Sequence, residues 1–105
     1  MKQTSKARLE RDGWKVGNAD EFLGLDEVES ALVDVRVSLA RALRQRRRDQ
    51  KISQATLAKR VGSSQSRVAK MEAGDPSVTI DLLMRTLLAA GSTRADLARV
   101  IAAAR

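Results

Sequence analysis

The 105-residue sequence predicts a mainly α-helical protein: a five-helix domain preceded by an N-terminal arm that contains a short β-strand. Three observations support this prediction. Apolar residues recur at spacings of three and four along most of the chain, which is the period of a helix. The sequence has one proline and only two aromatic residues, one Phe and one Trp, a composition that favours packed helices over a sheet. Its length suits one small domain and an arm rather than two full domains.

The arm, residues 1–26, carries the pattern of a very short strand. Trp14 and Val16 alternate with polar neighbours between two glycines. A strand of about four residues is not stable alone, so we expect it to pair with the same strand of a second chain about a two-fold axis. The alternative is a loop folded back on its own domain. The large apolar residues of the arm, which must cover the first helix, a dimer mate or another protein, are Trp14, Val16, Phe22, Leu23 and Leu25.

A single long helix is predicted over residues 27–50, with Asp26 as its N-cap. Its first part, residues 27–37, extends beyond the helical domain that follows, and we expect it to pack with the arm in a dimer. The run RQRRRDQK near its end is a cluster of charge. We interpret Arg46 and Arg48 in this run as a solvated helix end rather than as phosphate contacts.

The segment SQATLAKRVGSSQSRVAKMEAG, residues 53–74, predicts two short helices joined by a tight turn. The first helix covers residues 54–61, and Gly62 suits the left-handed position that ends a helix. Ser63 and Ser64 then offer hydroxyls that can accept from the free N–H groups of the next helix. Two helices and a short turn containing Gly are the signature of a helix-turn-helix.

The second helix of this pair, residues 65–73, combines apolar Val68 and Met71 with a polar and basic face. An α-helix fits the major groove of DNA, where Gln and Arg can make paired hydrogen bonds to adenine and guanine. The small residues Ser63 and Ser64 at the turn let the backbone approach a phosphate. The alternative is an ordinary helical hairpin with a solvated face. The expected DNA-facing residues of this helix are Gln65, Ser66, Arg67 and Lys70.

Two further helices are predicted over residues 80–90 and 94–104, each preceded by a Ser or Thr that can cap it. Together with the second part of the long helix, these elements define a DNA-binding domain over residues 38–91. The remaining residues, 92–105, contain the C-terminal helix.

The net charge of +7 is concentrated on the helix-turn-helix segment. Residues 38–74 contain ten basic and two acidic residues, a net charge of +8. Because basic side chains placed against DNA phosphates release counterions, this distribution favours a nucleic-acid partner.

The composition also argues against several other classes of protein. Without Cys or His, the chain lacks disulfides, thiolate ligands and the commonest general base, so we expect no enzyme activity, metal or cofactor. It contains neither a membrane-length apolar stretch nor a secretory signal, and we expect a cytoplasmic protein bound to the nucleoid.

The two predicted helices of residues 53–74 and their neighbours resemble the Xre/Cro-type, phage-repressor-like helix-turn-helix. The resemblance covers roughly residues 38–91, about half of the chain. The resemblance implies that Gln54 bonds a DNA phosphate and that the N-terminal half of the second motif helix contacts base edges. It also implies a structural ion pair between Arg47 and Glu72. The matching residues are Ser53, Gln54, Leu57, Ala58, Val61, Gly62, Gln65, Val68, Met71, Glu72 and Gly74.

The arm, the long first helix and the turn after Gly74 are also similar to small bacterial regulators that are often encoded beside toxins. The function we expect is a homodimeric, sequence-specific transcriptional regulator, a repressor, that reads an inverted-repeat operator on double-stranded DNA. The alternative is an antitoxin that binds and neutralises a cognate toxin protein through its N-terminal arm.

Overall fold

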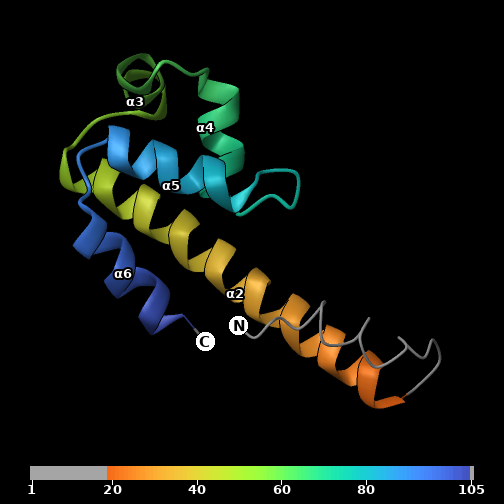
Figure 1. The fold of residues 1–105 in the computed structure, drawn as a ribbon. Coiled ribbons are helices and arrows are strands. Elements are labelled where there is room, and N and C mark those ends of the chain that lie inside the picture. Colours follow the sequence, from red (N-terminus) through yellow and green to blue (C-terminus); the bar gives the residue numbers. More distant parts are fainter. Residues whose placement is uncertain (1–18, 105) are drawn as a thin grey trace. The chain divides into compact units, whose positions relative to one another are not determined.

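The computed structural model of the chain describes the backbone of residues 19–104 and the side chains of residues 26–104. The described residues contain five helices and no strand (Figure 1), which confirms the mainly α-helical fold. The predicted strand at Trp14 and Val16 lies outside the described residues. The helices are α2 (Ala19–Asp49), α3 (Gln54–Val61), α4 (Gln65–Glu72), α5 (Ile80–Ala89) and α6 (Arg94–Ala103).

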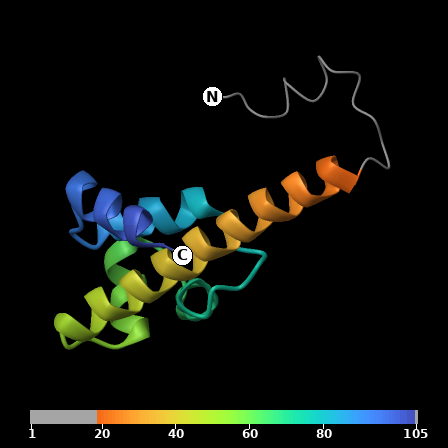
Figure 2. The same cartoon turned by 90° about the horizontal axis from the view of Figure 1, so that it is seen from below.

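The chain divides into two compact units, Met1–Ser30 and Ala31–Arg105. In the first unit, the described residues belong to the start of α2. The second unit holds the rest of α2 and the other four helices, and Figures 1 and 2 show α3, α4, α5 and α6 gathered around the C-terminal part of α2. This second unit contains the complete helix-turn-helix segment.

The long helix α2 begins at Ala19, so the predicted start at residue 27 is wrong. Asp26 lies inside the helix and is not its N-cap. The physical reason is that Gly24, which favours a break, costs a helix interior only about 1 kcal/mol relative to Ala. The acidic residues Asp20 and Glu21 also suit the positive end of a helix that starts at Ala19.

The four shorter helices each begin after a Ser or Thr whose hydroxyl accepts a hydrogen bond from a backbone N–H of the first turn. Gly62, with φ of 71°, ends α3 in the left-handed conformation. Because these signals are local, the predicted limits of all four helices agree with the structure to within one residue. The capping hydroxyls of Ser53, Ser64, Thr79 and Thr93 accept from the N–H groups of Thr56, Arg67, Leu82 and Asp96 at 3.0–3.2 Å.

One apolar core joins all five helices and the loop after α4. Leu39 and Leu43 of α2 are fully buried in it, as is Leu83 of α5. The short helices α3 and α4 each contribute only two residues to this core, so their position depends on packing against α2 and α5. The core residues are Leu39, Leu43, Leu57, Ala58, Val68, Met71, Val78, Leu83, Leu87 and Leu97.

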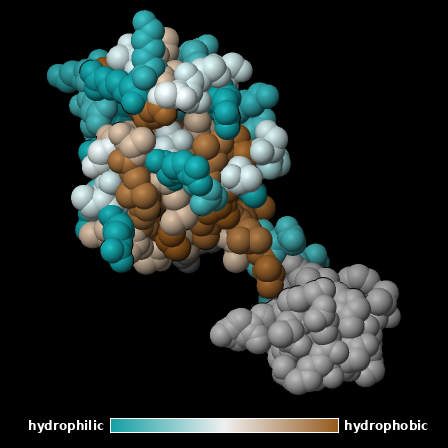
Figure 3. Space-filling view, turned by 45° about the horizontal axis from the view of Figure 1, so that its top comes forward, coloured by the Kyte–Doolittle hydropathy of each residue, from teal (hydrophilic) through white to brown (hydrophobic). Residues whose placement is uncertain are grey.

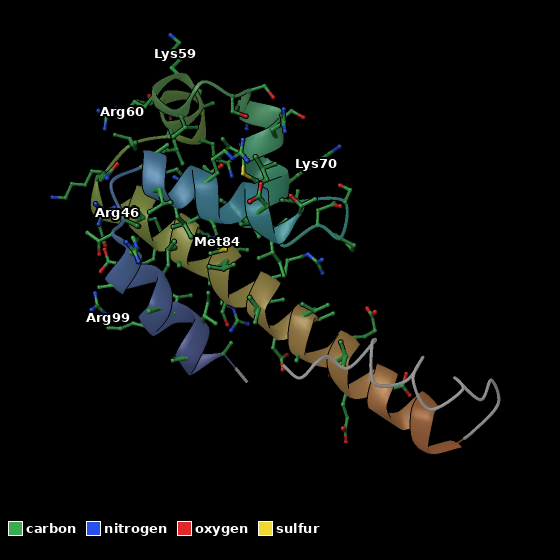
Figure 4. The ribbon with its side chains drawn as sticks, viewed as in Figure 1. Arg46, Lys59, Arg60, Lys70, Met84 and Arg99 are labelled. Carbon is green, nitrogen blue, oxygen red and sulfur yellow. The ribbon has the colours of Figure 1, made fainter. Side chains whose placement is uncertain are left out.

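Arg46 packs against the C-terminal end of α5 (Figure 4), so its interpretation as a solvated residue is wrong. Its Nε donates to the carbonyl oxygen of Ala90 at 3.2 Å, and Gln50 Nε2 donates to the same oxygen at 3.0 Å. Gly91 has φ of 104°, and a Cβ at this position would lie 2.6 Å from Arg46 Nη2. The side chain of Arg46 therefore satisfies a helix-end carbonyl, whereas Arg48 is exposed.

Two leucines of α5 allow a matched test of the core. Leu83→Ala should lower the free energy of unfolding by about 2–5 kcal/mol, because it removes a fully buried side chain and leaves a cavity. Leu88→Ala is the control on the same helix, since 44 % of Leu88 is exposed. Urea denaturation followed by circular dichroism measures both changes. Equal losses for the two variants would contradict the assigned core.

Candidate nucleic-acid interface

Helices α3 and α4 pack against each other through their apolar faces and are joined by a turn of three residues, 62–64. Gly62 turns the chain, and the N–H of Ser63 donates to the carbonyl oxygen of Ala58 at 2.8 Å. Behind α4, Val68 and Met71 are fully buried in the core. One side of α4 is thus packed against the rest of the domain, and its opposite side is exposed to solvent.

The outer face of α4 is polar and positively charged. The two cations on it, Arg67 and Lys70, are exposed, and Figure 4 shows Lys70 pointing away from the helix. In the described residues, neither cation takes part in a salt bridge. The structure therefore leaves exposed all four residues expected to face DNA: Gln65, Ser66, Arg67 and Lys70.

The two serines of the turn occupy different positions. Ser64 is exposed, and its hydroxyl accepts the N–H of Arg67, so it serves as the N-cap of α4. Ser63 is only partly exposed, and its Oγ is buried without a hydrogen-bond partner among the described residues. Of the two, Ser64 is thus the one whose side chain lies at the outer surface.

A chain of side-chain hydrogen bonds connects the first residue of α4 to the end of α2. Gln65 Nε2 donates to Gln54 Oε1 at 2.8 Å, and Gln54 Nε2 donates to Glu72 Oε1 at 3.1 Å. Arg47 makes a bidentate ion pair with Glu72, with Nη2 3.0 Å from Oε1 and Nε 2.6 Å from Oε2. Its Nη1 also donates to the carbonyl oxygen of Ile52 at 3.0 Å. The structure thus brings together three helices at this ion pair.

Burial and hydrogen bonding act in opposite directions on Glu72, whose side chain is only 4 % exposed. Burial raises the pKa of its carboxyl, whereas hydrogen bonds from Arg47 and Gln54 and the charges of Arg47 and Arg44 lower it. The net pKa lies below the usual value, so Glu72 is ionised at neutral pH. The hydrogen bond to Glu72 correspondingly raises the pKa of Arg47.

Shallow depressions lie beside α4. One has a volume of about 170 Å³ and is lined by Arg67, Lys70, Ser77, Val78 and Leu82. Another includes Arg44 of α2, a residue that the sequence analysis did not single out. Its position three residues before Arg47 places both on one side of α2, which is the signal that could have found it.

The arm residues fall outside this description. Trp14 and Val16 precede the described residues, and the side chains of Phe22, Leu23 and Leu25 also lie outside them. Within the described part of the chain, no helix has the length and apolar character that a membrane crossing requires.

The packed pair α3–α4, with a buried rear and an exposed basic front, defines a DNA-binding helix-turn-helix protein. Residues 43–87 match a family model described as Helix-turn-helix, so this segment is similar to the Xre/Cro-like type. No curated protein and no solved structure matches the chain. The match over this segment supports a DNA-binding transcription regulator.

The ion pair between α2 and α4 predicts a specific dependence of stability on pH. Since the folded-state pKa of Glu72 is lowered, its contribution is complete above the unfolded carboxyl pKa and is lost as the pH falls through the folded value. Glu72→Gln should therefore lower the free energy of unfolding by about 2–3 kcal/mol at pH 7, because Arg47 loses its charged partner. The stability of this variant should also depend less on pH at acidic pH, where Glu72 of the parent becomes protonated. Thermal unfolding from pH 7 to pH 3 measures both effects.

The control for this prediction is Asp81→Asn, which removes the acidic partner of Arg85 in a pair that is 75–79 % exposed. Its stability should remain close to that of the parent, since exposed ion pairs contribute little. A Glu72→Gln protein as stable as the parent at pH 7 would contradict the role assigned to the ion pair.

Proposed function

We propose that the protein is a homodimeric repressor that uses α4 to read the major groove of an inverted-repeat operator. The observation that carries this proposal is the division of α4 into a fully buried rear, Val68 and Met71, and an exposed polar front. A helix held in this way presents the same side chains in a constant orientation. Such an arrangement suits recognition of base edges, which depends on geometry.

The amide of Gln65 is suited to adenine. One of its N–H groups donates to Gln54, which leaves its second N–H and its Oε1 for another partner. Adenine offers one acceptor and one donor in the major groove, and a Gln amide can bond to both. We assign Gln54 the task of orienting this amide while its own outer side bonds a phosphate.

The cationic residues have two different tasks in this proposal. Arg67 lies in the first half of α4, where a guanidinium can bond to both acceptors of a guanine. Lys70 lies one turn further along and suits a base edge or a phosphate. Ser64 and Ser66 suit phosphates or bases near the start of the helix, and Ser63 gives the turn a small residue near the backbone.

A dimer follows from the symmetry that such operators have. Two copies related by a two-fold axis would place their α4 helices in successive major grooves, about 34 Å apart on one side of the DNA. An apolar band on one face of the molecule supports pairing of protein surfaces (Figure 3). In the second unit, the large exposed apolar residues are Leu32, Val33, Leu88 and Ile101. Of these, Leu32 and Val33 belong to the part of α2 that we assign, with the arm, to dimerisation.

A second candidate function is that of an antitoxin whose arm binds a cognate toxin protein. The observation that favours it is the concentration of Trp14, Val16, Phe22, Leu23 and Leu25 in a short segment of the sequence. The two functions are compatible, because one protein could repress an operon and neutralise its product. Co-purification with the product of a neighbouring gene, lost on changing these residues to Ser, is the result that this candidate requires.

The base-reading role of Arg67 can be tested once selection from a randomised duplex pool has yielded an operator. Arg67→Ala should weaken operator binding by about 1–3 kcal/mol, because a bidentate contact to a guanine is lost, and should affect a mixed-sequence duplex less. Fluorescence anisotropy with labelled duplexes measures both affinities. Arg85→Ala on α5 is the control.

Two results would contradict this assignment. An equal loss on both duplexes would place Arg67 at the DNA backbone rather than at a base. If a protein with Gln65, Arg67 and Lys70 all changed to Ala retained its operator affinity, α4 would not be the reading helix.

The contribution of the arm to the dimer is tested by deleting residues 1–18, which leaves all described residues of α2 in place. The shortened protein should sediment as a monomer. Its operator affinity should fall by about 100-fold, because two separate monomers then bind the two half-sites independently. Analytical ultracentrifugation and anisotropy measure the two effects. If the shortened protein remained a dimer, the dimer interface would have to be assigned to α2 and α6 instead of the arm.

A further inference from the structure

The loop between α4 and α5, residues 74–79, carries a single charged residue, the acidic Asp75. This loop lies beside the cations of the reading helix, since its Ser77 lines the depression of about 170 Å³ together with Arg67 and Lys70. A carboxylate close to DNA repels the phosphates. The position of an acidic residue next to two DNA-facing cations therefore calls for a functional explanation.

The loop is fixed against α2 near both of its ends. At its start, a Cβ added to Gly74 would lie 3.9 Å from Val37 Cγ2 and 3.9 Å from Ala40 Cβ, so the backbone here packs closely on α2. Near its other end, Arg36 Nε donates to the carbonyl oxygen of Val78 at 3.1 Å, and the Val78 side chain is buried in the core. The loop therefore cannot move away from α4 without breaking contacts with α2.

Within the loop, hydrogen bonds hold Asp75 itself. Its N–H donates to the carbonyl oxygen of Lys70 at 3.1 Å, and its own carbonyl oxygen accepts the N–H of Val78 at 2.9 Å. The Asp75 Oδ1 atom accepts the N–H of Ser77 at 2.8 Å. Pro76, between these residues, has a fixed φ. The carboxylate of Asp75 thus has a constant position at the end of α4.

The carboxylate of Asp75 and the ammonium of Lys70 attract each other. Hydrogen bonds with Ser77 lower the pKa of Asp75 most, and the positive charge of Lys70 lowers it further, so the carboxylate is ionised at neutral pH. Among residues 26–104 the two groups form no salt bridge. The ammonium therefore lies within the influence of the carboxylate and remains available to another acceptor.

We infer that Asp75 is a specificity-determining residue of the DNA interface: its carboxylate keeps the Lys70 ammonium beside α4, within reach of a base edge, and opposes its extension to a phosphate. The inference rests on the proposed function and decides between the two partners left open there for Lys70. Pairing with phosphates supplies most of the affinity for DNA of arbitrary sequence. By weakening that mode of binding, Asp75 raises the ratio of operator affinity to non-specific affinity.

The first test compares Asp75→Asn with the parent on the selected operator and on a mixed-sequence duplex. Asn keeps an oxygen that can accept the N–H of Ser77, so the substitution removes only the charge. Affinity for the mixed-sequence duplex should rise by about threefold to tenfold at physiological salt, and the slope of its log affinity against log salt should steepen by up to about 0.9, because one more ammonium reaches a phosphate. Operator affinity should rise less, so the ratio of the two affinities should fall.

The matched control is Asp96→Asn on α6. The Asp96 carboxylate accepts a backbone N–H, that of Thr93, at the same distance of 2.8 Å, but Asp96 lines neither depression beside α4. The affinity ratio and the salt slope of this variant should equal those of the parent. A role of Asp75 limited to the fold is distinguishable, because a damaged loop would weaken binding to both duplexes, whereas we expect a gain.

A second test asks whether Asp75 acts through Lys70. In a Lys70→Gln protein, Asp75→Asn should change neither the affinity ratio nor the salt slope, because the ammonium that the carboxylate restrains is absent. An effect of the same size in both backgrounds would overturn the inference, since the carboxylate would then only repel DNA in general. An Asp75→Asn protein with the parent's ratio and slope would overturn it as well. Failure of the proposed function is seen separately, because the parent itself would then not distinguish the operator from the mixed-sequence duplex.

Discussion

The ion pair between Arg47 and Glu72 is the interaction on which the DNA-binding surface depends. It joins the end of α2 to the end of α4, and it gives Gln54 a charged acceptor that fixes its amide. Gln54 in turn holds Gln65 at the start of α4. Withdrawing two charges from water is costly, and here the cost is offset because both carboxylate oxygens and the guanidinium are hydrogen-bonded. A buried electrostatic contact thus orients an exposed amide at the start of α4.

The reading helix has no independent stability. With eight residues, α4 is far shorter than the about 12–15 residues at which isolated helices become even marginally stable in water. Its shape is maintained by the Ser64 cap at one end, by Val68 and Met71 in the core, and by Glu72 at the other end. The side of α4 that faces outward can therefore be varied with little effect on the fold, and this separation suits a family of regulators that read different sequences.

The basic residues that dominate the charge of the segment have three distinct environments. Arg46 bonds the end of α5, and Arg47 is neutralised by Glu72. Arg44, Arg67 and Lys70 remain exposed beside or on α4. Because Arg46 and Arg47 are engaged within the protein, the net charge of the segment overstates the number of its phosphate contacts.

The sequence by itself determined the helix type of the chain, the limits of α3 to α6 and the polar front of α4, because caps such as Ser53 and left-handed glycines such as Gly62 act within one turn of the backbone. It misplaced the start of α2, since a break at Gly24 is a weak local preference that the rest of a long helix outweighs. Only the tertiary structure decided the environment of Arg46, whose partner Ala90 is 44 residues away, and brought Arg44 beside Gln54 and Ala73. Contacts between distant residues depend on how whole helices pack, and the local pattern around an arginine carries no record of that packing.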